Sequence, residues 1–372
     1  MKKIFAVILL LTMLLPLCAC RESEQIDEIA FVKVLGLDKT EDGILLTAGM
    51  QGPKPKEQNL GSSAQEYVSV TCETVSQGLS LLESETEKKI FFGQINSVLF
   101  GEDFAKSGIL DTVDYLVGSD ELRFDIPLVV VKDTTASKLI ENGSEEDMHI
   151  AEKIEKLLAV IYSTSISDKV EMSKVVNMLE DPFRSVYLPY VQAKNGGKDF
   201  SLEGFCVFRG DKMLDYLSPE ISRGVNFLND NVENAVLVLS LDDARVSLKI
   251  SKCKTKKQIK NGIFKMDVSF TSEILQADSQ IDELDEKTAQ KIIEKQNGEI
   301  KKLLNETVEK LKTYPTDCAG FGKTFENKSP KEAKKFENNW NETFGRIKYE
   351  INVESKIDPS KTSGKPVKQG GD

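Results

Sequence analysis

The chain has 372 residues, of which 40% are hydrophobic and 29% charged, and its formal net charge is −11 at pH 7. This length is ample for two or three domains. The excess of acidic residues argues against a nucleic acid partner, because general nucleic-acid binding depends on a cationic surface.

The N-terminus has the pattern of a bacterial export signal. Two lysines precede an apolar run over residues 4–17, which is shorter than the roughly 20 apolar residues that a transmembrane helix needs. The run ends in "LCAC", which is close to the lipobox that lipoprotein signal peptidase cleaves, although Cys18 at position −2 is unusual. We therefore predict that residues 1–19 are removed and that Cys20 carries acyl chains, which tether a soluble body to a lipid bilayer. A plain secreted protein with an incidental cysteine is the alternative.

Residues 20–195 are predicted to form an N-terminal α/β region, which a division near residue 134 would split into two subdomains. Apolar runs in 28–50 flank an acidic turn, "DKTEDG", and predict a strand–turn–strand, since the turn lacks the ligand set of a calcium loop. Further apolar runs predict strands, and apolar residues at helical spacing predict helices. These strands are expected over 66–72, 88–101 and 124–131, and the helices over 75–82, 110–117 and 135–179.

A Gly-rich polar break, "KNGGKD", is the predicted boundary before a C-terminal α+β domain over 200–356. Two short strands are predicted around "RGDK", where Gly and Asp fit a tight turn better than an adhesion motif. Ser218 and Pro219 are predicted to start a helix as N-cap and first helical residue. A long hairpin follows around the turn Asn261–Gly262. Its lysines are expected to form a solvated face, with binding to anionic headgroups or an acidic partner as the alternative, and they stand at 252, 254, 256, 257 and 260.

The end of this domain is predicted to contain a long amphipathic helix from about 281 to 311, whose apolar stripe packs on the adjoining sheet. Ser329 and Glu332 are placed as a capping box at the start of a last helix. Alternating apolar residues over 347–353 predict a final strand. Residues 357–372 offer little apolar surface to bury and are predicted to be disordered.

No catalytic motif is visible in the sequence. The only histidine, His149, is expected at a solvated helix start, and there is no GxSxG, HExxH or phosphate loop. Clustered thiols or histidines that would hold a metal are also missing. We therefore predict no catalytic residue, no metal, no cofactor and no enzymatic activity. The other mature cysteines are too scattered for a dense disulfide framework, and their redox state is left open: Cys72, Cys206, Cys253 and Cys318.

Five motifs resemble those of the Ger(x)C family, the lipoprotein C-subunits of spore germinant receptors. The segment "CRESEQIDEIA" is similar to the family's mature start, Cys-Trp-Asp-x-x-Glu-Ile-Asn-Glu-Leu-Ala, with Arg21 in place of the tryptophan. Four later segments resemble further family motifs in the same order: "KIFFGQINSVLFGEDFA", "LEGFCVFRGDKMLDYLSPEISRG", "DCAGFGKTF" and "ENNWNETF". Each match alone is a strand, turn or helix pattern, but five in order are specific, and they cover nearly the whole mature chain.

The resemblance implies a multi-domain α+β fold, with mixed sheets packed with helices, in a non-enzymatic protein anchored to the outer face of the spore inner membrane. It also implies assembly with a membrane A-subunit and a permease-like B-subunit into a receptor that triggers nutrient-induced germination. A solute-binding lipoprotein of a membrane transporter is the main alternative, and an envelope hydrolase ranks with it below the receptor. The motif residues, here called the signature positions, are expected to be structural: Phe92, Gly93, Gly204, Phe208, Asp211, Arg223, Gly224, Gly320, Gly322 and Trp340.

Overall fold

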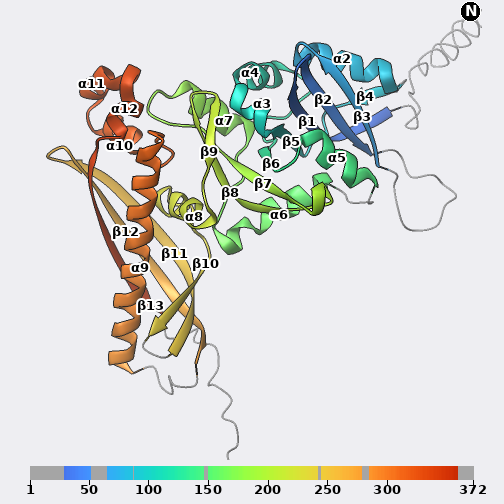
Figure 1. Cartoon of the computed structure of the whole chain (residues 1–372). Helices are drawn as coiled ribbons and strands as arrows, with labels where there is room; N and C mark the ends of the chain where they lie inside the picture. Colours follow the sequence, from blue (N-terminus) through green and yellow to red (C-terminus); the bar gives the residue numbers. More distant parts are fainter. Residues whose placement is uncertain are drawn as a thin grey trace, which may run out of the picture.

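The computed structural model describes residues 29–51, 65–86, 88–145, 150–241, 244–278 and 285–358 (Figure 1). These residues form two β-sheets with helices packed on them, which confirms the predicted α+β class with mixed sheets. Cys20, the predicted signal segment 1–19, His149 and residues 359–372 lie outside the described residues. Within the described part of the chain, no helix is both long enough and apolar enough to cross a membrane.

The large sheet and its helices take up the first part of the chain. Their bounds, in chain order, are β1 (Ile29–Thr40), β2 (Gly43–Gln51), β3 (Gln65–Cys72), α2 (Val75–Thr86), β4 (Lys89–Phe91), β5 (Ser97–Gly101), α3 (Glu102–Ser107), α4 (Leu110–Gly118), β6 (Leu128–Lys132), α5 (Ala136–Glu145), α6 (Ile150–Thr164), α7 (Met172–Glu180), β7 (Tyr187–Lys194), β8 (Asp199–Arg209) and β9 (Lys212–Tyr216).

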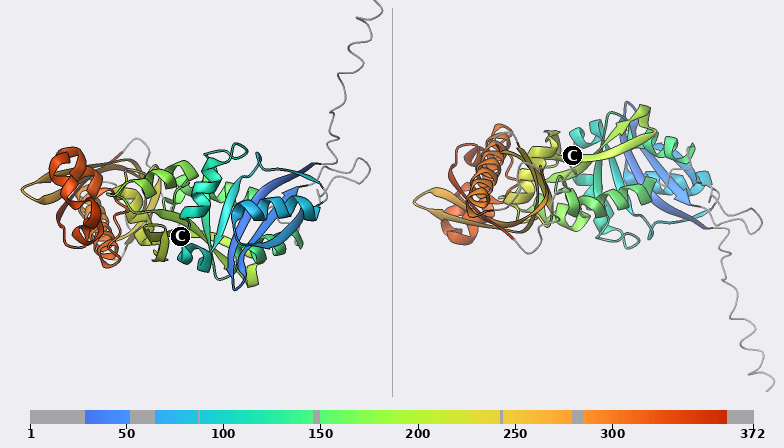
Figure 2. Two further views of the ribbon diagram at one scale, coloured as in Figure 1. Left: turned by 90° about the horizontal axis from the view of Figure 1, so that it is seen from above. Right: turned by 90° about the horizontal axis from the view of Figure 1, so that it is seen from below.

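The second sheet follows in the rest of the chain, and it lies beyond one end of the large sheet, so that the molecule is elongated (Figure 2). The bounds here are α8 (Pro219–Leu228), β10 (Ala235–Leu241), β11 (Ala244–Lys260), β12 (Ile263–Ala277), α9 (Glu286–Thr313), α10 (Phe321–Lys328), α11 (Pro330–Ala333), α12 (Trp340–Phe344) and β13 (Lys348–Ile357).

Among the described residues, nine strands form the large sheet, in the order β3-β2-β1-β5-β6-β7-β8-β9, with β4 beside the start of β1. Strands β1, β5, β6 and β7 run parallel, and the strands at both edges are antiparallel. Leu82 of α2 packs on one face, whereas Ile140 of α5 and Ile154 of α6 pack on the other. Because both faces are covered, β5 and β6 are buried and apolar along nearly their whole length.

The single strand predicted over 88–101 is wrong, because the structure contains two short strands there. Both β4 and β5 pair in parallel with β1, but β4 pairs with its start and β5 with its middle. A turn separates them, in which Ile95 N–H donates to the Phe92 carbonyl (3.1 Å). The turn lies opposite an irregularity between Val32 and Val34 of β1, where the chain is out of register with its neighbour. The irregular pairing of β1 with β2 and the gap between β4 and β5 therefore occur at the same place along β1.

A buried carboxylate joins β1 to the start of α5. Asp38 accepts hydrogen bonds from the N–H groups of Ala136 (2.8 Å) and Ser137 (2.7 Å). Burial raises the pKa of Asp38, and these two donors oppose the rise. The side chain thus satisfies N–H groups that α5 itself leaves unpaired, across 98 residues of sequence.

The polar break "KNGGKD", the predicted domain boundary, is a turn inside the large sheet. Asn195–Gly197 form one short 3-10 turn, and β7 and β8 on either side of it are antiparallel neighbours. Asn195 and both glycines have positive φ, which the tight reversal requires. The division of the chain into domains at this place stays a prediction.

The second sheet has the order β10-β11-β12-β13 and is covered by α9 along one face. The predicted hairpin is confirmed, since β11 and β12 pair around Asn261–Gly262, whose φ values are 53° and 74°. The predicted cap of α8 is confirmed as well, because Ser218 Oγ accepts from Ile221 N–H. Helix α9 begins after its N-cap, Asp285, and residue 281 lies outside the described residues.

The predicted capping box is wrong, because the Ser329 side chain makes no cap hydrogen bond, and α11 is a single turn followed by a 3-10 segment, Lys334–Asn339.

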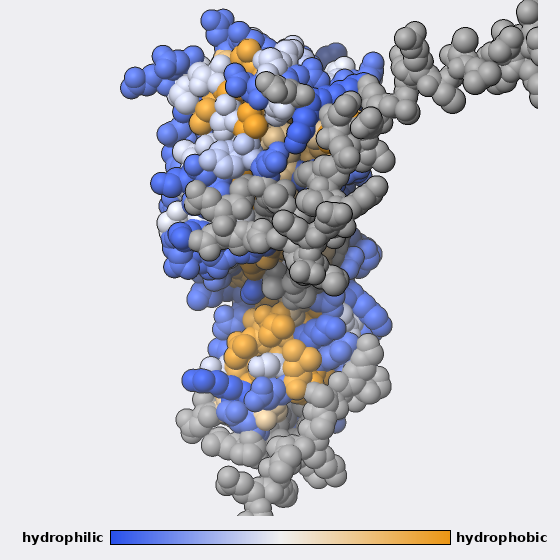
Figure 3. All heavy atoms as spheres, turned by 90° about the vertical axis from the view of Figure 1, so that its right-hand side faces the viewer, coloured by the Kyte–Doolittle hydropathy of each residue, from blue (hydrophilic) through white to orange (hydrophobic). Residues whose placement is uncertain are grey.

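Apolar side chains gather on the lower half of Figure 3, over the second sheet. The large apolar residues of this sheet that are exposed are Val236, Val238 and Leu275. The mature cysteines within the described residues are all free and buried: Cys72, Cys206, Cys253 and Cys318.

Candidate functional site at the junction of the two sheets

Two chain segments meet where the large sheet joins the second half of the molecule. Residues 183–186 lead into β7, and residues 314–320 connect α9 to α10. Ser185 N–H donates to the Asp317 carbonyl (3.1 Å), and Asp317 N–H donates to Ser185 Oγ (2.9 Å). The Ser185 hydroxyl donates in turn to Asn341 Oδ1 (3.3 Å). We call this region the junction.

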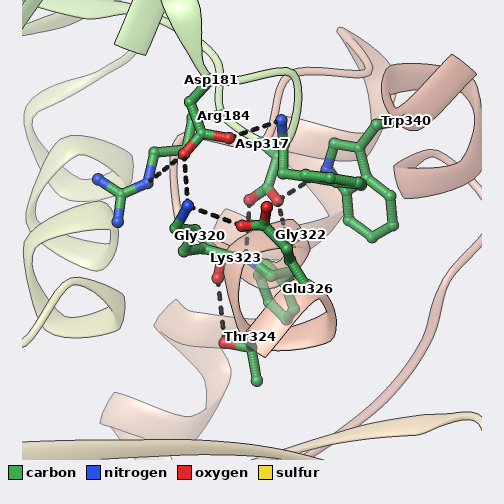
Figure 4. A network of polar contacts seen from close by, with 11 residues as sticks. Asp181, Arg184, Asp317, Gly320, Gly322, Lys323, Thr324, Glu326 and Trp340 are labelled. Carbon is green, nitrogen blue, oxygen red and sulfur yellow. Dashed lines mark hydrogen bonds and ion pairs between the residues drawn. The ribbon is translucent and has the colours of Figure 1, made fainter. Parts of the chain in front are cut away.

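The Asp317 side chain is buried in the junction and accepts three hydrogen bonds (Figure 4). The donors are the N–H groups of Phe321 (3.0 Å) and Gly322 (2.6 Å), at the start of α10, and Trp340 Nε1 (3.0 Å). Burial raises the pKa of Asp317, and these donors, together with Lys257, oppose that rise. One carboxylate therefore satisfies the first N–H groups of α10 and fixes the indole ring.

Gly322 and Gly320 have separate reasons to lack a side chain. A Cβ on Gly322 would lie 2.6 Å from the Trp340 ring and 2.7 Å from the Phe183 carbonyl oxygen, so the indole packs directly on the backbone. Gly320 has φ of 72°, a left-handed conformation that favours glycine, at the N-cap of α10. The Trp340 ring also meets Phe183 edge-on, with centroids 5.6 Å apart. These contacts attach α10 and α12 to the segment before β7.

Helix α8 packs between the large sheet and α9, and a glycine stands at each of these two close contacts. A Cβ on Gly204 of β8 would lie 2.4 Å from Ser222 Oγ, and that hydroxyl accepts from Phe205 N–H (3.0 Å). A Cβ on Gly224 would lie 1.9 Å from Thr307 Oγ1 on α9. The backbone of α8 thus approaches both neighbours more closely than any residue with a side chain would permit.

Arg223, which lies between these contacts, is half-buried on α8. Its Nε is buried and has no hydrogen-bond partner among the residues that the structure describes. Burial lowers the pKa of Arg223, and Glu220 opposes this. Phe208, on β8, is fully buried, and its N–H donates to the Val186 carbonyl (3.0 Å) at the junction.

The structure does not bring the remaining signature positions to the junction. Phe92 is buried in the core, and Gly93 stands in the turn between β4 and β5, where the Phe91 ring lies 2.8 Å from where its Cβ would be. Asp211 is in the turn between β8 and β9, and its carbonyl accepts from Ile109 N–H (3.1 Å). The signature positions therefore lie at several points of the fold and do not form one site, and that their role is structural stays a prediction.

A polar cavity of about 500 Å³ opens beside the junction and is lined from both halves of the molecule. On one side, Lys174 pairs with Asp168 (2.7 Å) and lies over the Tyr187 ring, 5.2 Å from its centroid. Burial acts to lower the pKa of Lys174, but Tyr187 and Asp168 outweigh it and the pKa is raised. No group of three or more residues suited to hold a metal occurs within the described part of the chain.

Lys257 lines the same cavity from β11 and corrects the predicted solvated face of the hairpin. Helix α10 packs over this end of β11, so Lys257 is half-buried, and its ammonium group donates to the Ala319 carbonyl. Burial lowers its pKa to about 8, although Asp317 opposes the shift. The prediction was right for exposed neighbours such as Lys254 and Lys256 but wrong for this side chain.

Sequence reasoning missed the residues that hold the junction together. Ser185 and Asp317 are 132 residues apart, and nothing in either local pattern links them. Asp317 did carry one usable signal, because an aspartate shortly before a helix start often satisfies its free N–H groups. That signal would have suggested a cap, but not the bond to Trp340.

Comparison with known proteins extends over both halves of the chain. Residues 22–193 match the family model described as spore germination protein N-terminal domain, and residues 203–361 match the one described as spore germination B3/GerAC like, C-terminal. The chain is 23% identical to spore germination protein KC of Bacillus subtilis (strain 168), with 99% of this chain and 98% of that protein covered. It is 22% identical to spore germination protein B3 of the same organism, with 95% and 97% covered. The solved structure of the GerBC protein is similar in fold, with a TM-score of 0.58 at 15% identity over 87% of this chain and 96% of that one.

Proposed function

Because the chain belongs to the spore germination B3/GerAC family in both its N-terminal and its C-terminal part, we propose that it is the lipid-anchored C-subunit of a spore germinant receptor. The observation that carries this proposal is the agreement along the whole length, since the two family models cover residues 22–193 and 203–361 and the GerBC fold covers both sheets. In this role the chain is not an enzyme. It assembles with an A-subunit and a B-subunit on the outer face of the spore inner membrane.

The anchor gives the proposal a physical basis. With Cys20 acylated, eight residues separate it from Ile29, so the tether reaches at most about 30 Å. A body held within that distance of the membrane meets membrane-embedded partners at a high effective concentration, and a modest interface then suffices. Two or three acyl chains supply stable attachment without a spanning helix.

The experiment that tests the proposal is a gene deletion complemented with three alleles: wild type, Cys20→Ala and Cys18→Ala. Cys18 is the matched control, because it lies next to the anchor in sequence but in the segment that processing would remove. Dipicolinate release is measured from purified spores exposed to amino acids, sugars and nucleosides, and copurification of the A- and B-subunits is measured from the dormant-spore inner membrane.

We expect the wild-type and Cys18→Ala alleles to restore both the nutrient response and the copurification, and the Cys20→Ala allele to restore neither. Full function of Cys20→Ala would contradict the anchor, and absence of the A- and B-subunits from the purified complex would contradict the assembly. Tight binding of a small solute by the purified protein, together with an unchanged germination response, would favour a transporter's binding lipoprotein instead.

A further inference from the structure

An apolar groove of about 930 Å³ lies at the end of the second sheet, between the β11–β12 turn and the helices α10, α11 and α12. These three helices stand at the upper left of Figure 1. The floor of the groove is aromatic. The Phe325 ring lies against Phe336, with centroids 5.8 Å apart, and against Trp340, at 6.1 Å. Phe264 of β12 and Ile347 extend the floor. Phe325 and Phe336 are only half-buried, so the groove offers them to a partner.

The rim of the groove is cationic, in contrast to a chain whose net charge is −11. Four exposed basic side chains stand on it, whereas its acidic residues are Glu332 and Glu342. Within the described residues, no hydrogen bond or ion pair occupies the four basic groups, which leaves their charges available to a ligand. They are Lys328, Lys335, Arg346 and Lys348.

The shape of the groove favours an amphipathic helix over a bilayer surface as its ligand. A flat bilayer surface is contacted by protruding apolar groups, but here the aromatic rings are buried or half-buried, whereas the charged side chains around them are exposed. A concave apolar floor of this volume accepts the side chains of an amphipathic helix, presented at positions i, i+3, i+4 and i+7. Carboxylates on the flanks of such a helix would face the basic rim and steer its approach.

We propose that this groove is a docking site for an acidic amphipathic helix of a protein partner. Apolar side chains of the helix bind over Phe325, Phe336 and Trp340, and its glutamates or aspartates face Lys335 and Arg346 from the rim. The proposal adds an interaction surface to the protein and does not depend on its role in germination. It uses residues outside the junction, so the two regions can be tested separately.

The protein contains its own reporter for this site, because Trp340 is the only tryptophan in the chain and its ring lies in the groove floor. The mature lipidated protein is placed in phosphatidylcholine vesicles and titrated with two designed 18-residue helices. Both have a leucine face, and the polar face is glutamate in one and lysine in the other. A third arm omits the peptides and adds phosphatidylglycerol to the vesicles.

We expect the glutamate helix to change Trp340 emission in a saturable manner that weakens with added salt, and the lysine helix to bind at least tenfold more weakly. The double variant Lys335→Glu, Arg346→Glu should bind the glutamate helix at least tenfold more weakly. A matched double variant of exposed α9 lysines, Lys287→Glu and Lys301→Glu, carries the same change in charge away from the groove and should bind as the wild type does.

Three results would overturn the proposal. One is that neither helix changes the emission, or that both bind equally. Another is that the two double variants weaken binding to the same extent, which would show a general charge effect. The third is that phosphatidylglycerol alone produces the emission change and competes with the peptide, which would assign the groove to a membrane surface.

Discussion

Gly224→Ala is the substitution for which the structure predicts the clearest cost. Gly224 lies inside α8, where α8 crosses α9. An added Cβ would stand 1.9 Å from Thr307 Oγ1 and 2.8 Å from Thr307 Cβ, and Thr307 is fully buried. Ordinary contact begins at 3.4 Å, so the two helices must separate by on the order of 1.5 Å or the threonine must move.

Two opposing terms set the magnitude. Replacing glycine by alanine inside a helix raises the free energy of unfolding by about 1 kcal/mol, through propensity alone. Overpacking a buried contact lowers it by about 1 to 3 kcal/mol, and the shortness of this contact places the cost at the upper end. We therefore expect Gly224→Ala to lower the free energy of unfolding by about 2 kcal/mol.

Gly298→Ala is the matched control, because Gly298 is also a helical glycine, in α9, and nothing lies within 4 Å of where its Cβ would be. It should raise the free energy of unfolding by about 1 kcal/mol. Urea unfolding of the unlipidated body, followed by the emission of Trp340, measures both. Thr307→Ala should rescue Gly224→Ala in part, since it removes Oγ1 but leaves the 2.8 Å contact with Cβ.

A Gly224→Ala protein as stable as the Gly298→Ala protein would contradict the close contact, because the helices would then have room that the structure does not show. So would a Thr307→Ala substitution that lowers the free energy of unfolding equally in the wild-type protein and in the Gly224→Ala variant. Either outcome would mean that the contact between α8 and α9 is looser than 1.9 Å implies.

Two more predictions concern the junction and its cavity. Gly322→Ala should lower the free energy of unfolding by about 2 kcal/mol and shift Trp340 emission to the red, because the added methyl displaces the indole. Gly118→Ala is the control, since nothing lies within 4 Å of where its Cβ would be, and it should leave the emission unchanged. The pKa of Lys257 is about 8 in the folded protein, below its ordinary 10.5, so the unfolded state binds more protons between these values and stability rises with pH across that window. Measured against a Lys257→Met variant, the wild type should gain stability from pH 8 to 10.5, and parallel curves would contradict the buried charge.

Local patterns predicted the parts of the fold that depend on neighbours in sequence. The Asn261–Gly262 turn needs two residues with positive φ, and the Ser218 cap needs one hydroxyl three residues before Ile221, so a few letters suffice for each. The break between β4 and β5 lies beside the irregularity of β1 near Lys33, and nothing within residues 88–101 indicates it. Periodicity within one segment carries no information about the register of its partner.

The junction was beyond prediction for the same reason. Asp317 meets Ser185 across 132 residues, and Asp38 meets Ala136 across 98. Burial of Lys257 depends on α10 packing over a hairpin whose own pattern indicates a solvated face. Each of these contacts is set by how the elements pack, whereas the alternation of apolar residues reports only which face of each element is covered.

Three motif glycines, Gly204, Gly224 and Gly322, stand where backbones pack closely, whereas the proposed recognition surface lies beside those motifs. Gly224 and Gly322 are glycines because a helix or an indole occupies the place of a side chain, so their substitution should act on stability. Lys335 and Arg346 stand outside every quoted motif and are exposed, and within the described residues their side chains make no hydrogen bond or ion pair. Reversal of their charge should leave urea unfolding unchanged and alter only the binding of an acidic helix. Loss of stability in the rim variants, or loss of helix binding in a stably folded Gly224→Ala protein, would show that this separation of fold from recognition is wrong.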